Sequence, residues 1–157
     1  MLITEIVGNT ATVDLPASDW KIETISFDDE SRLKRIQRAV TSTGEEVGLR
    51  LSNEYKEIKP GDILYQQDGR AIVADVKPTD VLIISPRSIH EALSVAHALG
   101  NRHLQAQFFT AEDGWDGEVM VVRYDHTVQS HLEHVQVPFT RDSKVMPEAF
   151  RHAEHTH

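Results

Sequence analysis

The chain contains no cysteine among its 157 residues. Disulfide bonds are therefore excluded, and so is a metal site built from thiolates. Any metal that the protein binds must be held by nitrogen and oxygen ligands. Nine histidines are available for this purpose, and neutral imidazole is a common ligand for zinc, copper and nickel.

Long apolar stretches are also missing. The longest apolar runs, such as residues 81–84, are far shorter than the roughly 20 residues that a membrane-spanning helix needs. The first residues lack the basic stretch and the small-residue cleavage site of a secretory signal. These features predict a cytoplasmic protein that does not enter a membrane.

Positive charge is scarce. The chain has 16 Lys and Arg against 25 Asp and Glu, which gives a formal net charge of −9 at pH 7. Such a charge repels phosphate backbones, and no basic stripe interleaved with aromatic residues is present. We therefore do not expect nucleic acid as a partner.

Catalytic motifs are absent as well. The sequence has no G-x-S-x-G nucleophile elbow, no glycine-rich phosphate loop and no H-E-x-x-H motif. Adjacent acidic pairs such as Asp28-Asp29 point to opposite faces of a strand and are poor acid–base candidates. We therefore expect a protein that is not an enzyme.

Residues 1–76 are predicted to form an all-β domain. Short apolar segments, broken by turn residues, have the spacing of a small β unit. Thr43-Gly44 and Asp68-Gly69 lie where hairpin turns are needed, the second between strands expected at 63–66 and 70–75. Residues 76–80 interrupt this pattern, and we place the domain boundary there.

Residues 77–140 are predicted to form a ferredoxin-like α+β domain with the order β-α-β-β-α-β. A buried strand at 81–85 precedes a helix that begins with the capping-box spacing of Ser88 and Glu91. The expected buried face of this helix consists of apolar residues at helical spacing: Ile89, Ala92, Leu93, Ala96 and Leu99. Gly100 is expected to end the helix with a positive φ.

Four more elements complete that order. They are strands at 103–110 and 117–123, a helix at 126–134 capped by Asp125, and a strand at 135–139. After residue 140 the chain becomes polar and loses its periodicity. Residues 141–157 are therefore expected to form a flexible, histidine-containing tail.

Three histidines lie close together near the end of the chain: His152, His155 and His157. This spacing lets a flexible segment wrap several imidazoles around one ion, at an ordering cost that limits the affinity. The alternatives are a solvated terminus without metal contact and a remnant of an expression tag. We interpret the three residues as ligands of a weak, exchangeable metal site.

His103 follows the first predicted helix, within the segment Ala98-Leu-Gly-Asn-Arg-His-Leu-Gln-Ala-Gln-Phe108. A lone histidine in a strand is more often a structural residue than a ligand, and one imidazole does not hold a metal tightly. A two-fold dimer would duplicate the imidazole and form a paired site across the interface. His103 is therefore a candidate ligand on the condition that the chain dimerises.

The other histidines are weaker candidates. His126 begins the second predicted helix, where it could face the same surface as the tail, and is a candidate accessory ligand. The remaining four are interpreted as surface residues: His90, His97, His131 and His134.

Several segments together match a known pattern. They are Leu99-Gly-Asn-Arg-His103, Gln105-Ala-Gln-Phe108, Tyr124-Asp-His126, residues 51–64, Val137-Pro-Phe139 and the terminal histidines. With these segments the chain resembles, over nearly its whole length, the UreE family of urease accessory proteins, which are nickel metallochaperones.

The resemblance implies a homodimer joined through the ferredoxin-like domains, in which His103 from each subunit meets at the two-fold axis and holds Ni(II). The terminal histidines are then secondary ligands. His126 falls on a position that is histidine in some members and is implicated there in peripheral metal binding. A neighbouring position that can also be histidine is Tyr124 here, which puts that accessory site in doubt. Zn(II) and Cu(II) are accepted by the same imidazoles.

The resemblance also implies the partners, which are the urease accessory GTPase and the activation complex of the urease apoprotein. Residues 1–76 would contribute partner recognition. Transfer of the metal proceeds by ligand exchange and needs no catalysis. Two other functions are compatible with the same histidines: a metal-responsive sensor or storage protein, and an interaction scaffold in which the histidines are incidental.

Overall fold

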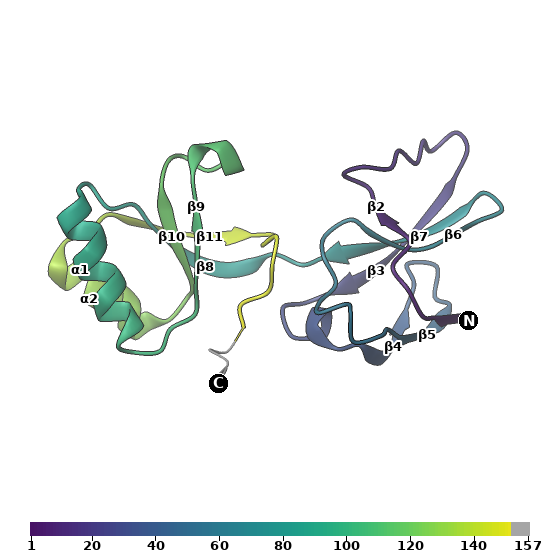
Figure 1. Cartoon of the computed structure of the whole chain (residues 1–157), viewed down its shortest axis with the longest axis horizontal. Coiled ribbons are helices and arrows are strands. Elements are labelled where there is room, and N and C mark those ends of the chain that lie inside the picture. The colour runs from purple at the N-terminus through teal and green to yellow at the C-terminus, as the bar shows by residue number, and fades with distance from the viewer. Residues whose placement is uncertain (152–157) are drawn as a thin grey trace. The chain divides into compact units, whose positions relative to one another are not determined.

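The computed structural model describes residues 1–151 of the chain (Figure 1). Within these residues there are eleven strands, two α-helices and two short 3-10 helices. The chain divides into two compact units. The first unit consists of Met1–Pro78 and Val145–Ala149, and the second contains Thr79–Lys144 and the chain from Phe150 onward. A mixed content of mostly sheet with two helices confirms the predicted α+β class.

Two sheets make up the first unit, with strand orders β1-β5-β4 and β2-β6-β7-β3 (Figure 1). The strands are β1 (Leu2–Ile3), β2 (Gly8–Asn9), β3 (Lys21–Phe27), β4 (Ile36–Val40), β5 (Glu46–Arg50), β6 (Asp62–Gln67) and β7 (Arg70–Val76). A 3-10 helix, η1 (Ser31–Leu33), follows β3. The core between the strands contains fully buried side chains, among them Ile25, Phe27, Leu49, Ile58 and Ile72.

Both predicted hairpins of the first unit are confirmed. The strands β4 and β5 pair antiparallel around Gly44, and β6 and β7 pair antiparallel around Asp68-Gly69. Asp68 and Gly69 both have positive φ, at 52° and 76°. Two such residues form the mirror-image turn whose twist matches that of the flanking strands.

The second unit has one four-stranded antiparallel sheet of order β11-β8-β10-β9, and both helices cover the same face of it (Figure 1). Its elements are β8 (Thr79–Ile84), α1 (Ile89–Gly100), β9 (Ala106–Phe109), η2 (Ala111–Asp113), β10 (Val119–Arg123), α2 (His126–Val135) and β11 (Phe139–Lys144). Its core joins apolar residues of β8 and β10 to Val95 and Leu99 of α1 and to Val128 and Leu132 of α2. Neither helix is long and apolar enough to span a bilayer.

Local hydrogen bonds begin both helices where the sequence predicted. The Ser88 side chain accepts a hydrogen bond from the N–H of Glu91 at 3.1 Å, and Asp125 Oδ1 accepts one from the N–H of Thr127 at 2.8 Å. Each bond satisfies a backbone donor that the first helical turn leaves without a partner. These caps depend only on residues within three positions, which is why the sequence suffices to predict them.

The buried face of α1 agrees with the prediction at Leu99 and differs from it at Ile89 and Leu93. Val95 and Leu99 are buried, whereas Ile89 and Leu93 are 81% and 66% exposed. Apolar residues of α1 occupy two neighbouring stripes, and helical periodicity does not decide which stripe the sheet covers. The sheet covers the stripe of Val95 and Leu99 and leaves that of Ile89 and Leu93 uncovered.

The chain after residue 140 also differs from the expected flexible tail. The strand β11 pairs with β8 along Phe139–Lys144, and the side chains of Met146, Ala149 and Phe150 are buried. Most residues of this edge strand are exposed and polar, so the strand has no apolar periodicity and is recognisable only by its backbone pairing. His152, His155 and His157 lie outside the described residues.

Candidate metal-binding site

His103 follows the last turn of α1 and has a left-handed backbone conformation, with φ at 56°. The N–H of His103 donates to the carbonyl of Gly100 at 3.0 Å, and the N–H of Leu104 donates to the carbonyl of Leu99 at 3.4 Å. This pair of hydrogen bonds is the Schellman motif, whose left-handed position is usually glycine. The predicted role of Gly100 is therefore wrong. Gly100 is the last helical residue, and the residue with positive φ is His103.

A histidine in this conformation costs free energy. The left-handed region is disfavoured for L-residues by roughly 1–2 kcal/mol, although histidine is found there more often than most residues. The His103 side chain is exposed, so core packing does not require an imidazole at this position. Residues held in such conformations cluster at functional sites. The backbone geometry therefore marks His103 as a functional candidate.

Exposed apolar side chains lie on α1 and on the neighbouring edge strand β9. Ile89 and Leu93 of α1 are uncovered, and Phe108 of β9 is 67% exposed. A cavity of about 380 Å³ is lined by Leu93 and Phe108 together with residues of β10. Exposed apolar surface of this kind is typical of a protein interface.

Gly100 lies at the end of the α1 stripe that contains Ile89 and Leu93, eleven and seven residues after them. A Cβ atom built on Gly100 would have no other atom within 4 Å, and its φ is not positive. Neither the packing nor the backbone of the described chain therefore requires glycine at this position. His103 follows three residues later.

The other histidines of the described chain are spread over both helices. His126 is exposed at the start of α2, and His134 is exposed in its last turn. His97 Nε2 lies 3.3 Å from the side-chain amide of Asn101. His90 and His131 line one groove of about 330 Å³. The sequence does not reveal that these two residues line one groove, because they are 41 positions apart and belong to different helices.

Residues 1–151 contain no group of three or more His, Asp or Glu side chains that could hold a metal ion. The described part of a single copy therefore does not assemble a complete set of ligands. Of the five residues singled out by sequence, the structure places His103 after α1 and His126 at the start of α2, both exposed. His152, His155 and His157 are not described.

Comparison with known proteins gives consistent similarities over the whole chain. Residues 3–77 match the family model described as UreE urease accessory protein, N-terminal domain. The chain is 51% identical over 158 residues to a urease accessory protein UreE from Corynebacterium urealyticum, with both chains fully covered. It is 47% identical over 163 residues to a protein of the same name from Pseudarthrobacter chlorophenolicus, again with full coverage of both. The corresponding protein of Staphylococcus carnosus is 41% identical over 157 residues, which cover all of this chain and 99% of that protein.

Proposed function

Because the chain belongs to the UreE family of urease accessory proteins, we propose that it is a nickel metallochaperone. It binds Ni(II) as a homodimer and delivers the ion to the urease activation complex, where the urease metallocentre is assembled. The observation that carries this proposal is the exposed imidazole of His103, which is held in a disfavoured backbone conformation beside an uncovered apolar stripe of α1.

A shared site accounts for the incomplete set of ligands in one chain. Two copies related by a two-fold axis bury the same surface patch on each subunit. If the α1 stripes of two copies meet, Ile89 and Leu93 become buried, and Gly100 permits a close approach of the two helix ends. The two His103 imidazoles then lie near the axis, where together they supply two nitrogen ligands.

Two imidazoles leave several coordination positions of Ni(II) open. The terminal histidines His152, His155 and His157 are proposed to fill some of these positions, and His126 to act as an accessory ligand. Open and weakly filled positions allow an acceptor to take the ion by ligand exchange. The same nitrogen donors bind Zn(II), and by the usual affinity order they bind Cu(II) more strongly.

The two domains are proposed to have different functions. Residues 77–140 form the ferredoxin-like domain that binds metal and dimerises, and residues 1–76 recognise partners. Residues 141–157 contain the tail histidines. The partners are the urease accessory GTPase and the urease apoprotein, and the setting is the cytoplasm.

Equilibrium dialysis with Ni(II) tests the ligand assignment. The number of ions per dimer is measured for the intact protein, for a protein lacking residues 152–157, and for His103→Ala. Removal of the terminus should lower the capacity and leave the ion shared across the dimer, whereas His103→Ala should remove that ion. His90→Ala changes an exposed histidine at the start of the same helix and serves as the matched control. Nickel binding by His103→Ala equal to that of the intact protein would remove the central assignment.

A transfer experiment separates delivery from sensing or storage. The nickel-loaded dimer is mixed with the GTPase partner and the urease apoprotein, and the distribution of nickel is measured after the proteins are separated. Nickel should leave the dimer and appear on the acceptor. Nickel that stays on the dimer would indicate a sensor or storage protein.

A further inference from the structure

The sheet β1-β5-β4 of the first unit has one face packed on the core and one face that is exposed. Ile3 of β1 and Leu49 of β5 are buried in the core. The alternate positions of the same strands point outward, and in a sheet with one face on the core these positions are commonly polar. Here they include three exposed apolar side chains: Leu2 at 59%, Ile36 at 68% and Val40 at 55%.

Seven residues occupy the outward positions of the three strands: Leu2 of β1, Ile36, Arg38 and Val40 of β4, and Glu46, Gly48 and Arg50 of β5. We call them the outward face of the first unit. Gly48 lies in the register between Leu2 on one side and Arg38 on the other. A Cβ atom built on Gly48 would lie 3.4 Å from Leu2 Cδ1, so the Leu2 side chain extends over the glycine. No side chain therefore separates Leu2 from the apolar residues of β4.

The charge of the outward face is opposite in sign to that of the whole chain. The chain has 16 basic and 25 acidic residues, with a formal net charge of −9. The outward face has two arginines, Arg38 and Arg50, and one acidic residue, Glu46, which pairs with Val40 at the end of the β4–β5 hairpin. The apolar side chains are thus accompanied by a local excess of positive charge.

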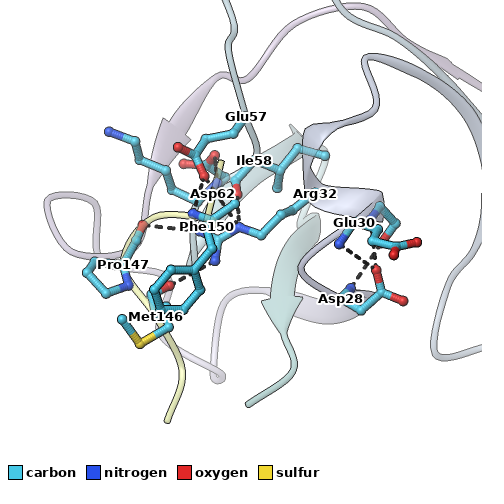
Figure 2. A network of polar contacts seen from close by, with 12 residues as sticks. Asp28, Glu30, Arg32, Glu57, Ile58, Asp62, Met146, Pro147 and Phe150 are labelled. Carbon is cyan, nitrogen blue, oxygen red and sulfur yellow. Dashed lines mark hydrogen bonds and ion pairs between the residues drawn. The ribbon is translucent and has the colours of Figure 1, made fainter. Parts of the chain in front are cut away.

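Arg32, in η1 of the same unit, shows what an arginine with a structural role looks like in this fold. It is buried, and its guanidinium donates hydrogen bonds to three backbone carbonyls, those of Ile58 at 3.0 Å, Met146 at 2.9 Å and Pro147 at 3.1 Å (Figure 2). Its Nε also lies 3.5 Å from Glu57 Oε2. Every charged nitrogen of Arg32 is therefore used inside the unit.

Arg38 and Arg50 have no such role. Arg70, like Arg32, is engaged within the unit, because it forms ion pairs with Glu23 and Glu45. Arg38 and Arg50 are exposed, and within residues 1–151 neither of them takes part in an ion pair. Their guanidinium groups remain available to carboxylates of another molecule.

We propose that the outward face of the first unit binds a partner protein that presents carboxylates beside apolar side chains. The inference rests on the proposed function, in which residues 1–76 recognise partners, and it names the surface and the chemistry of that recognition. The three apolar side chains of the face become buried in the complex and supply affinity. The two arginines pair with the carboxylates of the partner, which speeds association and fixes the orientation.

A second copy of the chain fits this face less well. Arg38 lies in the middle of the face, between Ile36 and Val40 on β4. In a two-fold pairing of the face with itself, the same patch meets on both subunits, so Arg38 would approach the Arg38 of the other copy. Like charges brought together in an interface oppose binding. An acidic partner avoids this repulsion.

Binding of the full-length protein to the urease accessory GTPase and to the urease apoprotein, measured by surface plasmon resonance, tests the proposal. Ile36→Glu places a carboxylate in the apolar part of the face and should weaken binding of at least one of the two proteins about tenfold or more. Ile22→Glu is the matched control, because Ile22 is an isoleucine of β3 in the other sheet and is 43% exposed. It should leave binding unchanged. Urea unfolding of both variants shows that the unit remains folded.

Charge reversal tests the role of the arginines. Arg38→Glu and Arg50→Glu should each slow association and weaken binding several-fold, because they repel the carboxylates of the partner. Binding by the intact protein should weaken as salt is added, since salt screens exposed charges, and this salt dependence should shrink in both variants. Lys21→Glu reverses an exposed charge at the start of β3 and should change neither the affinity nor its salt dependence.

The outcomes separate this face from the proposed function. Nickel binding and dimerisation of Ile36→Glu should match those of the intact protein. Partner binding that is the same in Ile36→Glu as in the intact protein would overturn the face and leave partner recognition by residues 1–76 in place. An intact protein that binds neither the GTPase nor the apoprotein would overturn that recognition and this face with it. Loss of the dimer in Ile36→Glu would show that a second copy occupies the face, which also contradicts the proposal.

Discussion

Replacing His103 with glycine tests whether this residue is present for its imidazole or for its backbone. The left-handed conformation at φ 56° costs an L-residue roughly 1–2 kcal/mol, and glycine adopts it without that cost. Against this gain, glycine has more freedom in the unfolded chain, which costs about 0.4–1 kcal/mol. The exposed imidazole adds little burial. His103→Gly should therefore raise the free energy of unfolding by about 0.5–1 kcal/mol.

The assay has two parts. Unfolding of the metal-free protein by heat and by urea measures stability, where the expected gain corresponds to a rise in Tm of roughly 2–8 °C for a unit of this size. Equilibrium dialysis then measures nickel. His103→Gly and His103→Ala should lose the shared ion equally, whereas only the glycine variant should become more stable. A gain in stability for His103→Gly alone, with the same loss of nickel in both variants, would show that the imidazole is needed for the metal and not for the fold.

Gln136 provides the matched control. It ends α2 in the same left-handed conformation, with φ at 57°, and its side chain is no candidate ligand. Gln136→Gly should gain similar stability and leave nickel binding unchanged. A His103→Gly protein that is less stable than the unmodified protein would refute the reasoning from backbone strain, and one that binds nickel as well as the unmodified protein would refute the ligand assignment.

Three further outcomes are expected. Leu93→Glu introduces a charge at a side chain that is 66% exposed, so it should dissociate the dimer in analytical ultracentrifugation without destabilising the monomer. The control Ser94→Glu should leave the dimer intact. A dimer that tolerates Leu93→Glu would have its interface elsewhere. A hydrogen bond from Arg70 lowers the pKa of Glu23 from 4.5 to about 2. The stabilisation that this shift provides is on the order of 3 kcal/mol. It is present above about pH 4.5 and is lost as the pH falls toward 2. Glu23→Gln should flatten the pH dependence of urea unfolding in that window, and an unchanged profile would contradict the assignment. Nickel binding should weaken as the pH falls, because a protonated imidazole cannot ligate a metal. A site that is insensitive to acid would indicate carboxylate or backbone ligands instead.

Sequence reasoning succeeds best where a feature depends on near neighbours. The caps at Ser88 and Asp125 and the turn at Asp68-Gly69 each involve residues within three positions of one another. Their chemistry is therefore visible in a short stretch of sequence. Near neighbours in the sequence also predict that α1 ends shortly before His103, although the prediction assigned the positive φ to Gly100 and the structure places it at His103.

The strand β3 shows where such reasoning stops. Residues 19–34 contain many polar and acidic side chains and no regular apolar alternation. Lys21–Phe27 nevertheless forms a seven-residue strand that pairs in parallel with β7. Within it Glu23 is 3% exposed, because hydrogen bonds from Arg70 and Thr43 satisfy its carboxylate. These partners come from other parts of the chain, so a charge that looks solvated in the sequence is buried in the fold.

The sequence by itself determined the chemistry available to this protein. Without cysteine, any metal that the protein binds must be held by nitrogen and oxygen ligands, and the motif around His103 identifies the UreE family. Only the tertiary structure decided that α1 leaves the stripe of Ile89 and Leu93 uncovered, and that Val145–Ala149 returns to Arg32 and Glu57. The physical reason is the same in both cases. Which face of a helix is covered, and where a buried charge finds its partner, depend on contacts between residues far apart in the chain, and no local periodicity encodes those contacts.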